Sequence, residues 1–307
     1  MARRPVDLLT GRTPRLHGSA GVAMGALVAA LVLATAPARA LDLRAMWDFA
    51  QPALSEQRFV AALDAASPDE RLILRTQIAR THGLRRDLAK AREILAEVAP
   101  ALAAASPEAR VRYHLELGRT FASAAHPPDL PQEARDEARR LFLRARDLAV
   151  AARLDDLAID AVHMMAFVDT APAQQAAWAR DALLMLERSD QPEAKRWEGS
   201  LRNNLGVALK QQGEAEAAIE QFQRSRAAYL RDGRARHARY ADWMIGWTER
   251  GRGRRAAALE IQLRLEREWA AAGEVDADVF EELDALYTVL GDPARAAHYR
   301  ARMKEAR

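Results

Sequence analysis

His163, Met164 and Met165 follow one another in the sequence, and their side chains are of types that can ligate a soft metal ion or a haem iron. The same segment, which continues with Ala166 and Phe167, could instead belong to a packed inner helix, because methionine fills irregular gaps in apolar cores. No second cluster of histidine and methionine lies nearby in the sequence, and this favours packing. We therefore expect no metal site and no cofactor.

The sequence contains none of the short motifs that place catalytic groups. It has no glycine-rich phosphate loop, no His-Glu-x-x-His and no Gly-x-Ser-x-Gly. It has no cysteine, which excludes disulfides, thiolate zinc sites and cysteine nucleophiles. Its carboxylates are spread along segments of helical pattern, where they are usually solvated or paired. We expect no catalytic residues and no enzymatic activity, and an enzyme with an unfamiliar site is the least favoured alternative.

Residues 1–40 have the layout of a secretory signal peptide. A basic start is followed by an apolar run from Ala20 to Ala34, which is short for a membrane span, and then by the small-x-small triplet ending at Ala40. Cleavage after Ala40 would make Leu41 the first residue of the mature chain, and an uncleaved anchor is the alternative. We expect a periplasmic or secreted protein that meets a membrane only through this segment.

Removing this segment changes the charge balance. The whole chain has 46 Lys and Arg against 43 Asp and Glu, whereas residues 41–307 have 41 against 42. The basic character therefore lies in the leader. A nearly neutral mature chain gives no sign of a nucleic-acid partner, which would need a basic face.

Beyond residue 41 the pattern is helical throughout. Good helix formers dominate, and apolar residues recur at spacings of three and four. Small residues also repeat at a fixed distance in the sequence. The separation between Gly206 and Ala218 is the same as that between Gly246 and Ala258. A period of about 40 residues indicates an array of helix pairs that must stack to bury their apolar faces. We expect an all-α solenoid of about seven pairs.

The repeats resemble the tetratricopeptide repeat family. The best copy carries Asn204, Leu205, Gly206, Leu209, Gly213, Ala218 and Phe222, and a second carries Leu117, Gly118, Phe121, Ala138, Phe142 and Ala145. The last copy keeps Phe280, Leu283, Tyr287, Gly291 and Ala296 but has Asp284 where the family favours glycine. The copy around Gly246 has Asp242 and Glu249 at positions where apolar residues are expected.

The resemblance divides the chain into a signal peptide, 1–40, and a helical repeat domain, 41–307. The clearest repeats are 199–232, 239–272 and 277–307, with a further one at 110–152. The pairs at 69–100 and 154–188 fit only loosely, so their register stays open. The family's fold is a right-handed superhelix.

In such arrays the first helix of each pair lines a concave groove that holds a peptide, so the resemblance implies a protein or peptide partner. The groove candidates are Arg112 and Arg119 near Gly118; Asn203, Asn204 and Lys210 near Gly206; and Tyr240, Trp243 and Trp247 near Gly246. The three aromatic residues share one helical stripe. That stripe could anchor an apolar side chain of the partner, or it could simply be core.

Some members of the family clamp a partner's C-terminal carboxylate with Asn and Lys or Arg, and the resemblance allows that role for Asn203, Asn204 and Lys210. Asn204 stands where the family often has asparagine in any case. The leading hypothesis is therefore a non-enzymatic, exported protein that binds a protein or peptide in its groove. The alternative is a scaffold of an envelope complex that self-associates through its terminal helices.

Overall fold

The computed structural model describes residues 41–127 and 129–306 of the chain. The expected leader segment and its cleavage position after Ala40 lie outside these residues. All regular elements within them are helical, which confirms the all-α prediction. None of the helices in this part of the chain combines the length and apolarity that a membrane crossing requires.

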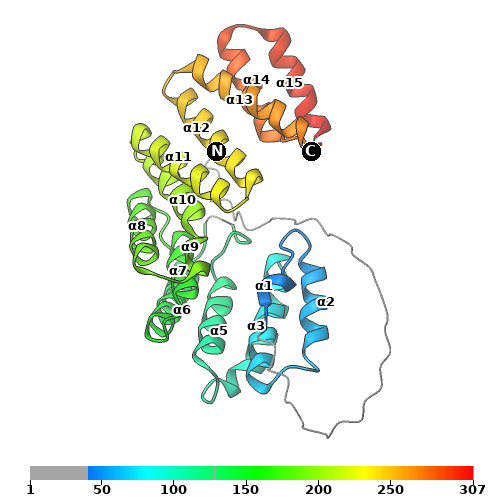
Figure 1. Cartoon of the computed structure of the whole chain (residues 1–307), viewed down its shortest axis with the longest axis vertical. Helices are drawn as coiled ribbons and strands as arrows, with labels where there is room; N and C mark the ends of the chain where they lie inside the picture. Colours follow the sequence, from blue (N-terminus) through cyan, green and yellow to red (C-terminus); the bar gives the residue numbers. More distant parts are fainter. Residues whose placement is uncertain (1–40, 128, 307) are drawn as a thin grey trace, which may run out of the picture.

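The helices follow one another as packed pairs along an elongated, curved array (Figure 1). The array begins with α1 (Leu43–Met46) and α2 (Pro52–Ala62). The pairs are α3 (Pro68–Leu84) with α4 (Leu88–Val98), α5 (Pro107–Arg119) with α6 (Gln132–Ala151), α7 (Asp155–Met164) with α8 (Pro172–Arg188), α10 (Glu198–Gln211) with α11 (Ala215–Arg231), α12 (Ala235–Gly251) with α13 (Arg255–Ala271), and α14 (Ala277–Leu290) with α15 (Pro293–Glu305). Short pieces are η1 (Ala99–Ala101), η2 (Met165–Phe167) and α9 (Pro192–Lys195). The described residues thus form six pairs, with α1 and α2 in place of a seventh.

Helix boundaries follow from local chemistry. Ser67 and Glu70 form a reciprocal capping box at the start of α3, where Pro68 occupies the first helical turn. Gly213, in the turn between α10 and α11, has a φ of 84°, a left-handed conformation that costs glycine little. Arg86 and Arg153 adopt the same conformation between α3 and α4 and between α6 and α7, with φ values of 66° and 54°.

The turn between α3 and α4 is not made by a glycine. Gly83 is not a turn residue but lies inside α3, and the turn that follows is made at Arg86. The glycine pattern misleads here because an arginine takes the left-handed position.

The charged residues that interrupt the apolar pattern of α12 have partners on neighbouring helices and turns. Asp242 is 6% exposed and accepts hydrogen bonds from Arg226 at 2.8 Å and from Arg264 at 3.2 Å. Glu249 lies 3.4 Å from Arg252. Compensated in this way, Asp242 and Glu249 leave the pair α12–α13 in the same arrangement as its neighbours.

Candidate binding surface on the first helices

The first helices of successive pairs meet along one side of the array. α3 contacts α5, α5 contacts α7, and α12 contacts α14, whereas the contacts between second helices are weaker. The first helices therefore lie on the inner side of the curve. We call this surface the inner face and define it by Gln77, Arg80, Glu116, Arg119, Asp160, His163, Asn204, Val207, Lys210, Trp247, Arg250 and Glu282.

At the N-terminal end the inner face is a chain of buried ion pairs. Arg80 lies 3.6 Å from Glu116, and Arg119 bonds Glu116 at 2.5 Å. One guanidinium nitrogen of Arg119 also donates to both oxygens of Asp160, at 2.5 and 2.6 Å. Burial would raise the pKa of Asp160, but the charges of Arg119 and Arg80 outweigh burial and hold that pKa below its ordinary value. This series of ion pairs joins α3, α5 and α7.

The predicted groove residues Arg112 and Arg119 are thus both paired with carboxylates of this protein. Arg112 donates to Glu108, one helical turn away, at 2.8 Å. Arg119 is shared between Glu116 and Asp160, and its side chain is 12% exposed. Both charges are neutralised by the chain's own carboxylates, so a ligand anion would have to displace these.

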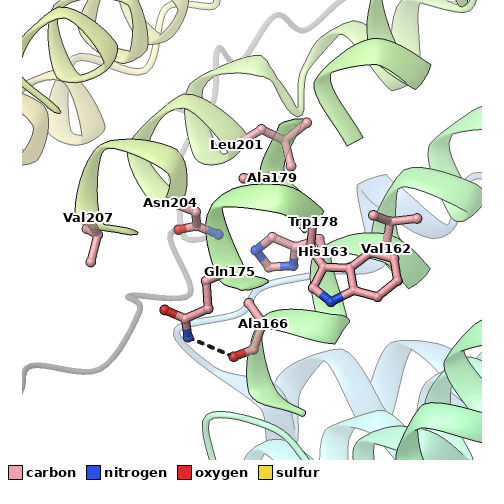
Figure 2. Close-up of a pocket in the computed structure, with 9 residues that line it drawn as sticks. All are labelled: Val162, His163, Ala166, Gln175, Trp178, Ala179, Leu201, Asn204 and Val207. Atoms are coloured by element: carbon pink, nitrogen blue, oxygen red, sulfur yellow. Dashed lines mark hydrogen bonds between the residues drawn. The ribbon is translucent and has the colours of Figure 1, made fainter. Parts of the chain in front are cut away.

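The middle of the inner face is hollowed between α7, α8 and α10. His163, Gln175 and Asn204 lie at this pocket with apolar neighbours (Figure 2). The other two residues of the possible metal motif, Met164 and Met165, are 5% and 0% exposed and belong to the core. No group of three or more His, Asp or Glu residues in the described part of the chain is arranged to hold a metal ion.

Further along, Lys210 of α10 lies over the indole of Trp247 of α12. The Nζ atom is 3.2 Å from the ring centroid, a close cation–π contact. Burial and the nearby charge of Arg250 lower the pKa of Lys210, while Glu282 opposes this shift. Among the residues that the structure describes, no carboxylate lies within ion-pair distance of Lys210.

The carboxylate of Glu282 cannot relieve this imbalance, because it is already paired with the guanidinium of Arg250. The Nε and one terminal nitrogen of Arg250 bond the two oxygens of Glu282 at 2.6 and 2.9 Å, and the Glu282 side chain is only 4% exposed. Arg250 and Glu282 together are neutral, so Lys210 adds an uncompensated positive charge to the face. This positive charge next to an indole is the feature of the inner face that most favours the binding of an anionic group.

The aromatic stripe of α12 divides between core and surface. Trp243 is 7% exposed and packs with Leu265 and Leu283. Trp247 is half-buried and stacks on Trp243, with ring centroids 5.8 Å apart. Tyr240 lies against Trp269 of α13 at 5.6 Å. Only Trp247 of the three is therefore on the inner face.

The two predicted asparagines also differ in their exposure. Asn203 is 2% exposed, and its Oδ1 has no hydrogen-bond partner among the described residues. Asn204 is half-buried and lines the pocket. Of Asn203, Asn204 and Lys210, only the last two share the inner face.

Arg80, Asp160 and His163 belong to the inner face although their spacing did not predict them there. A signal for Arg80 exists: Ala79 precedes Ala91 by the same distance in sequence that separates Gly206 from Ala218, and both alanines are 1% exposed. Arg80 follows Ala79 as Arg119 follows Gly118 and Trp247 follows Gly246. The residue after the small one faces inward in each of these pairs.

No family model matches this sequence, and no curated protein does. Solved structures do match. A signal-transduction ATPase with numerous domains from Pyrococcus horikoshii, which has a tetratricopeptide repeat sensor, has a TM-score of 0.61 at 12% identity, over 82% of this chain and 38% of that one. This chain thus spans about two fifths of that protein. BtubC from P. vanneervenii has a TM-score of 0.40 at 14% identity, over 87% and 91% of the two chains, a likeness too weak to bear on the fold. Together, the packed helix pairs and the match to the ATPase give this chain a tetratricopeptide-like helical repeat fold.

Proposed function

We propose that this protein binds a segment of another protein on its inner face and catalyses no reaction. The observation that carries the proposal is the contact between Lys210 and Trp247. A half-buried cation without a carboxylate partner gains most from an anionic group, because partial burial strengthens the attraction. The indole beside it offers apolar area to the same ligand.

The other charges of the inner face favour a protein segment over a nucleic acid. Glu116, Asp160 and Glu282 place carboxylates along the face. Because these carboxylates already neutralise Arg119 and Arg250, a polyphosphate chain laid along the face would gain little from those arginines, whereas a peptide with a single acidic group needs only the charge of Lys210. We therefore propose an acidic side chain as the group that docks there.

Self-association through the terminal helices is less well supported. The outward side of α15 carries Arg295, His298, Arg300 and Lys304, all exposed. A polar outer face on a terminal helix ends a repeat array rather than extending it. We favour binding of a different protein for this reason.

Selection from a library of random, C-terminally amidated 12-residue peptides tests the proposal. The bait is protein purified after expression of the full chain, compared with its Lys210→Glu variant. Lys304→Glu is the matched control, because it makes the same charge change on exposed α15. We expect peptides rich in Asp or Glu to be enriched on the wild type and on Lys304→Glu but not on Lys210→Glu. Enrichment that is equal on all three proteins would rule out this site.

We also propose that the protein acts outside the cytoplasm, on the strength of the layout of residues 1–40. N-terminal sequencing of the protein from a periplasmic fraction tests this. A mature chain that begins at Leu41 supports export with cleavage, and a chain that begins at Met1 in the cytoplasmic fraction contradicts it.

A further inference from the structure

The pocket in the middle of the inner face lies between two charged regions. It is lined by Val162, His163, Ala166, Gln175, Trp178, Ala179, Leu201, Asn204 and Val207, which come from α7, η2, α8 and α10 (Figure 2). The empty space at the pocket is roughly 400 Å³, a volume that includes space open to solvent. Two of its wall residues, Ala166 and Ala179, are small, and the space exists because neither fills it.

The wall of the pocket differs in charge from its surroundings. None of its nine lining residues is Asp, Glu, Lys or Arg. Asp160, which is paired with Arg119, comes before the lining residues of α7, and Lys210 comes after those of α10. A charged group that entered the pocket would lose hydration without gaining a counter-ion, which is costly. The pocket therefore selects an uncharged group.

The size of the pocket limits its occupant. Sites for whole small molecules span about 300–1,000 Å³ and bury most of the ligand surface. This pocket is at the lower end of that range even when its open part is counted. It suits a single aliphatic side chain better than a cofactor. The Nε2 of Gln175 donates to the backbone oxygen of Ala166 at 3.0 Å, which ties α8 to η2 at the pocket and keeps the cavity in shape.

We propose that this pocket binds an uncharged aliphatic side chain of about leucine size, carried by the same segment whose acidic group docks at Lys210. The inference rests on the proposed function and specifies its ligand. Val207 and Asn204 line the pocket and lie three and six residues before Lys210 on α10, which is roughly 4.5 and 9 Å along the helix axis. An extended peptide covers such a distance in about two to three residues. The ligand thus combines a leucine-like and an acidic side chain about two to three residues apart.

Fluorescently labelled, end-blocked peptides of alanine and serine test this pairing. Each peptide has one fixed glutamate and one leucine, placed two to five residues away in either direction, and a second set has aspartate in place of leucine. Binding is measured by fluorescence anisotropy with protein from the full chain. The variants are Ala166→Leu, which fills the pocket, and Ala177→Leu, which adds the same side chain at an exposed position of α8 outside it. Circular dichroism confirms that each variant is folded.

At one spacing the leucine peptide is expected to bind the wild type at least tenfold more tightly than its aspartate counterpart. Ala166→Leu should reduce this preference to less than twofold, Ala177→Leu should keep it, and Lys210→Glu should weaken both sets. Equal binding of the two sets at every spacing, or a preference that survives Ala166→Leu, overturns the pocket while the Lys210 site stands. If no peptide binds any of the proteins, both the pocket and the proposed function are wrong.

Discussion

The ring of Phe222 in α11 lies over Gly206 in α10, in the space that a side chain at Gly206 would occupy. A Cβ built on Gly206 would come within 2.5 Å of the ring, and Phe222 is 0% exposed, so the ring has no free space into which to move. Phe142 lies over Gly118 in the same way in the pair α5–α6. This contact sets the separation of the two helices in these two pairs.

Gly206→Ala is expected to destabilise the protein by about 1–3 kcal/mol, the usual cost of overpacking a core. The measurement is the free energy of unfolding from urea titration monitored by circular dichroism. Gly251→Ala is the control, because it lies near the end of α12 with nothing within 4 Å of the added Cβ. There the better helix propensity of alanine should leave stability unchanged or slightly higher. Similar losses in both variants would contradict the packing role of Gly206.

The fold could be predicted from the sequence because its repeating contact is local. Gly206, Ala218 and Phe222 belong to one helix pair and lie close together in the chain, so their spacing is visible in the sequence. In the pair α3–α4, Ala79 stands in place of the glycine and packs in one cluster with Ala91 and Leu95, and Arg86 makes the turn. These substitutions hide the pair from a search for glycines although they preserve its geometry.

The inner face was harder to predict because its partners lie far apart in the sequence. Lys210 and Trp247 were identified from their stripes, but that they touch each other is a tertiary contact. Arg119 meets Asp160, 41 residues away, on a helix whose register was open. Spacing identifies the residues that face inward, whereas only the fold shows which of their charges are already neutralised.

Asp160→Ala should destabilise the protein by about 3–5 kcal/mol. The change removes one of the two carboxylates that Arg119 bonds and leaves Glu116 between the guanidinium groups of Arg119 and Arg80, and an uncompensated buried charge is costly. Arg75→Ala provides the comparison, since its ion pair with Glu97 is about half exposed and should contribute less than about 1 kcal/mol. Urea titration at pH 7 distinguishes them, and equal effects would show that the ionic chain contributes no more than a surface pair.

His114 should make the protein less stable as the pH falls below neutrality. Burial, together with the nearby charges of Arg144 and Arg140, lowers the pKa of His114 to about 4, from 6.5 in the unfolded chain. Between these two values the unfolded state binds a proton that the folded state does not, so protons favour unfolding. Stability should therefore decrease from about pH 6.5 to pH 4. The pKa of His126 is also lowered, chiefly by burial, and contributes in the same direction.

The check is the melting temperature of the wild type and of His114→Gln at pH 7, 6 and 5. We expect the melting temperature of the variant to fall less over this range, with His298→Gln on exposed α15 as the control. A slope that is unchanged in His114→Gln would assign the pH dependence to other groups.

Trp47 should anchor the N-terminal helices α1 and α2 to α3. Its ring stacks on Phe49 at 4.6 Å and meets Phe59 edge-on at 5.0 Å, and its indole nitrogen donates to Gln77 at 3.1 Å. Trp47→Ala is expected to cost about 3 kcal/mol, since it removes a large aromatic contact and leaves the Gln77 oxygen without its donor. Val60→Ala should cost little, because Val60 is about half exposed on α2. Limited proteolysis provides a second readout: cleavage before residue 60 should accelerate in Trp47→Ala alone.

Alanine variants of Trp243 and Trp247 should affect different properties, the first mainly stability and the second mainly peptide binding. Trp243 is 7% exposed within the core formed with Leu265 and Leu283, so Trp243→Ala should cost about 3–5 kcal/mol. Trp247 is half-buried, with Lys210 on its ring, so Trp247→Ala should cost clearly less in stability while it weakens capture of acidic peptides at least tenfold. A variant that changes both residues would mix the two effects, and the single variants are needed. Peptide binding that survives Trp247→Ala in a folded protein would move the binding site away from Lys210, and an unchanged stability of Trp243→Ala would contradict its place in the core.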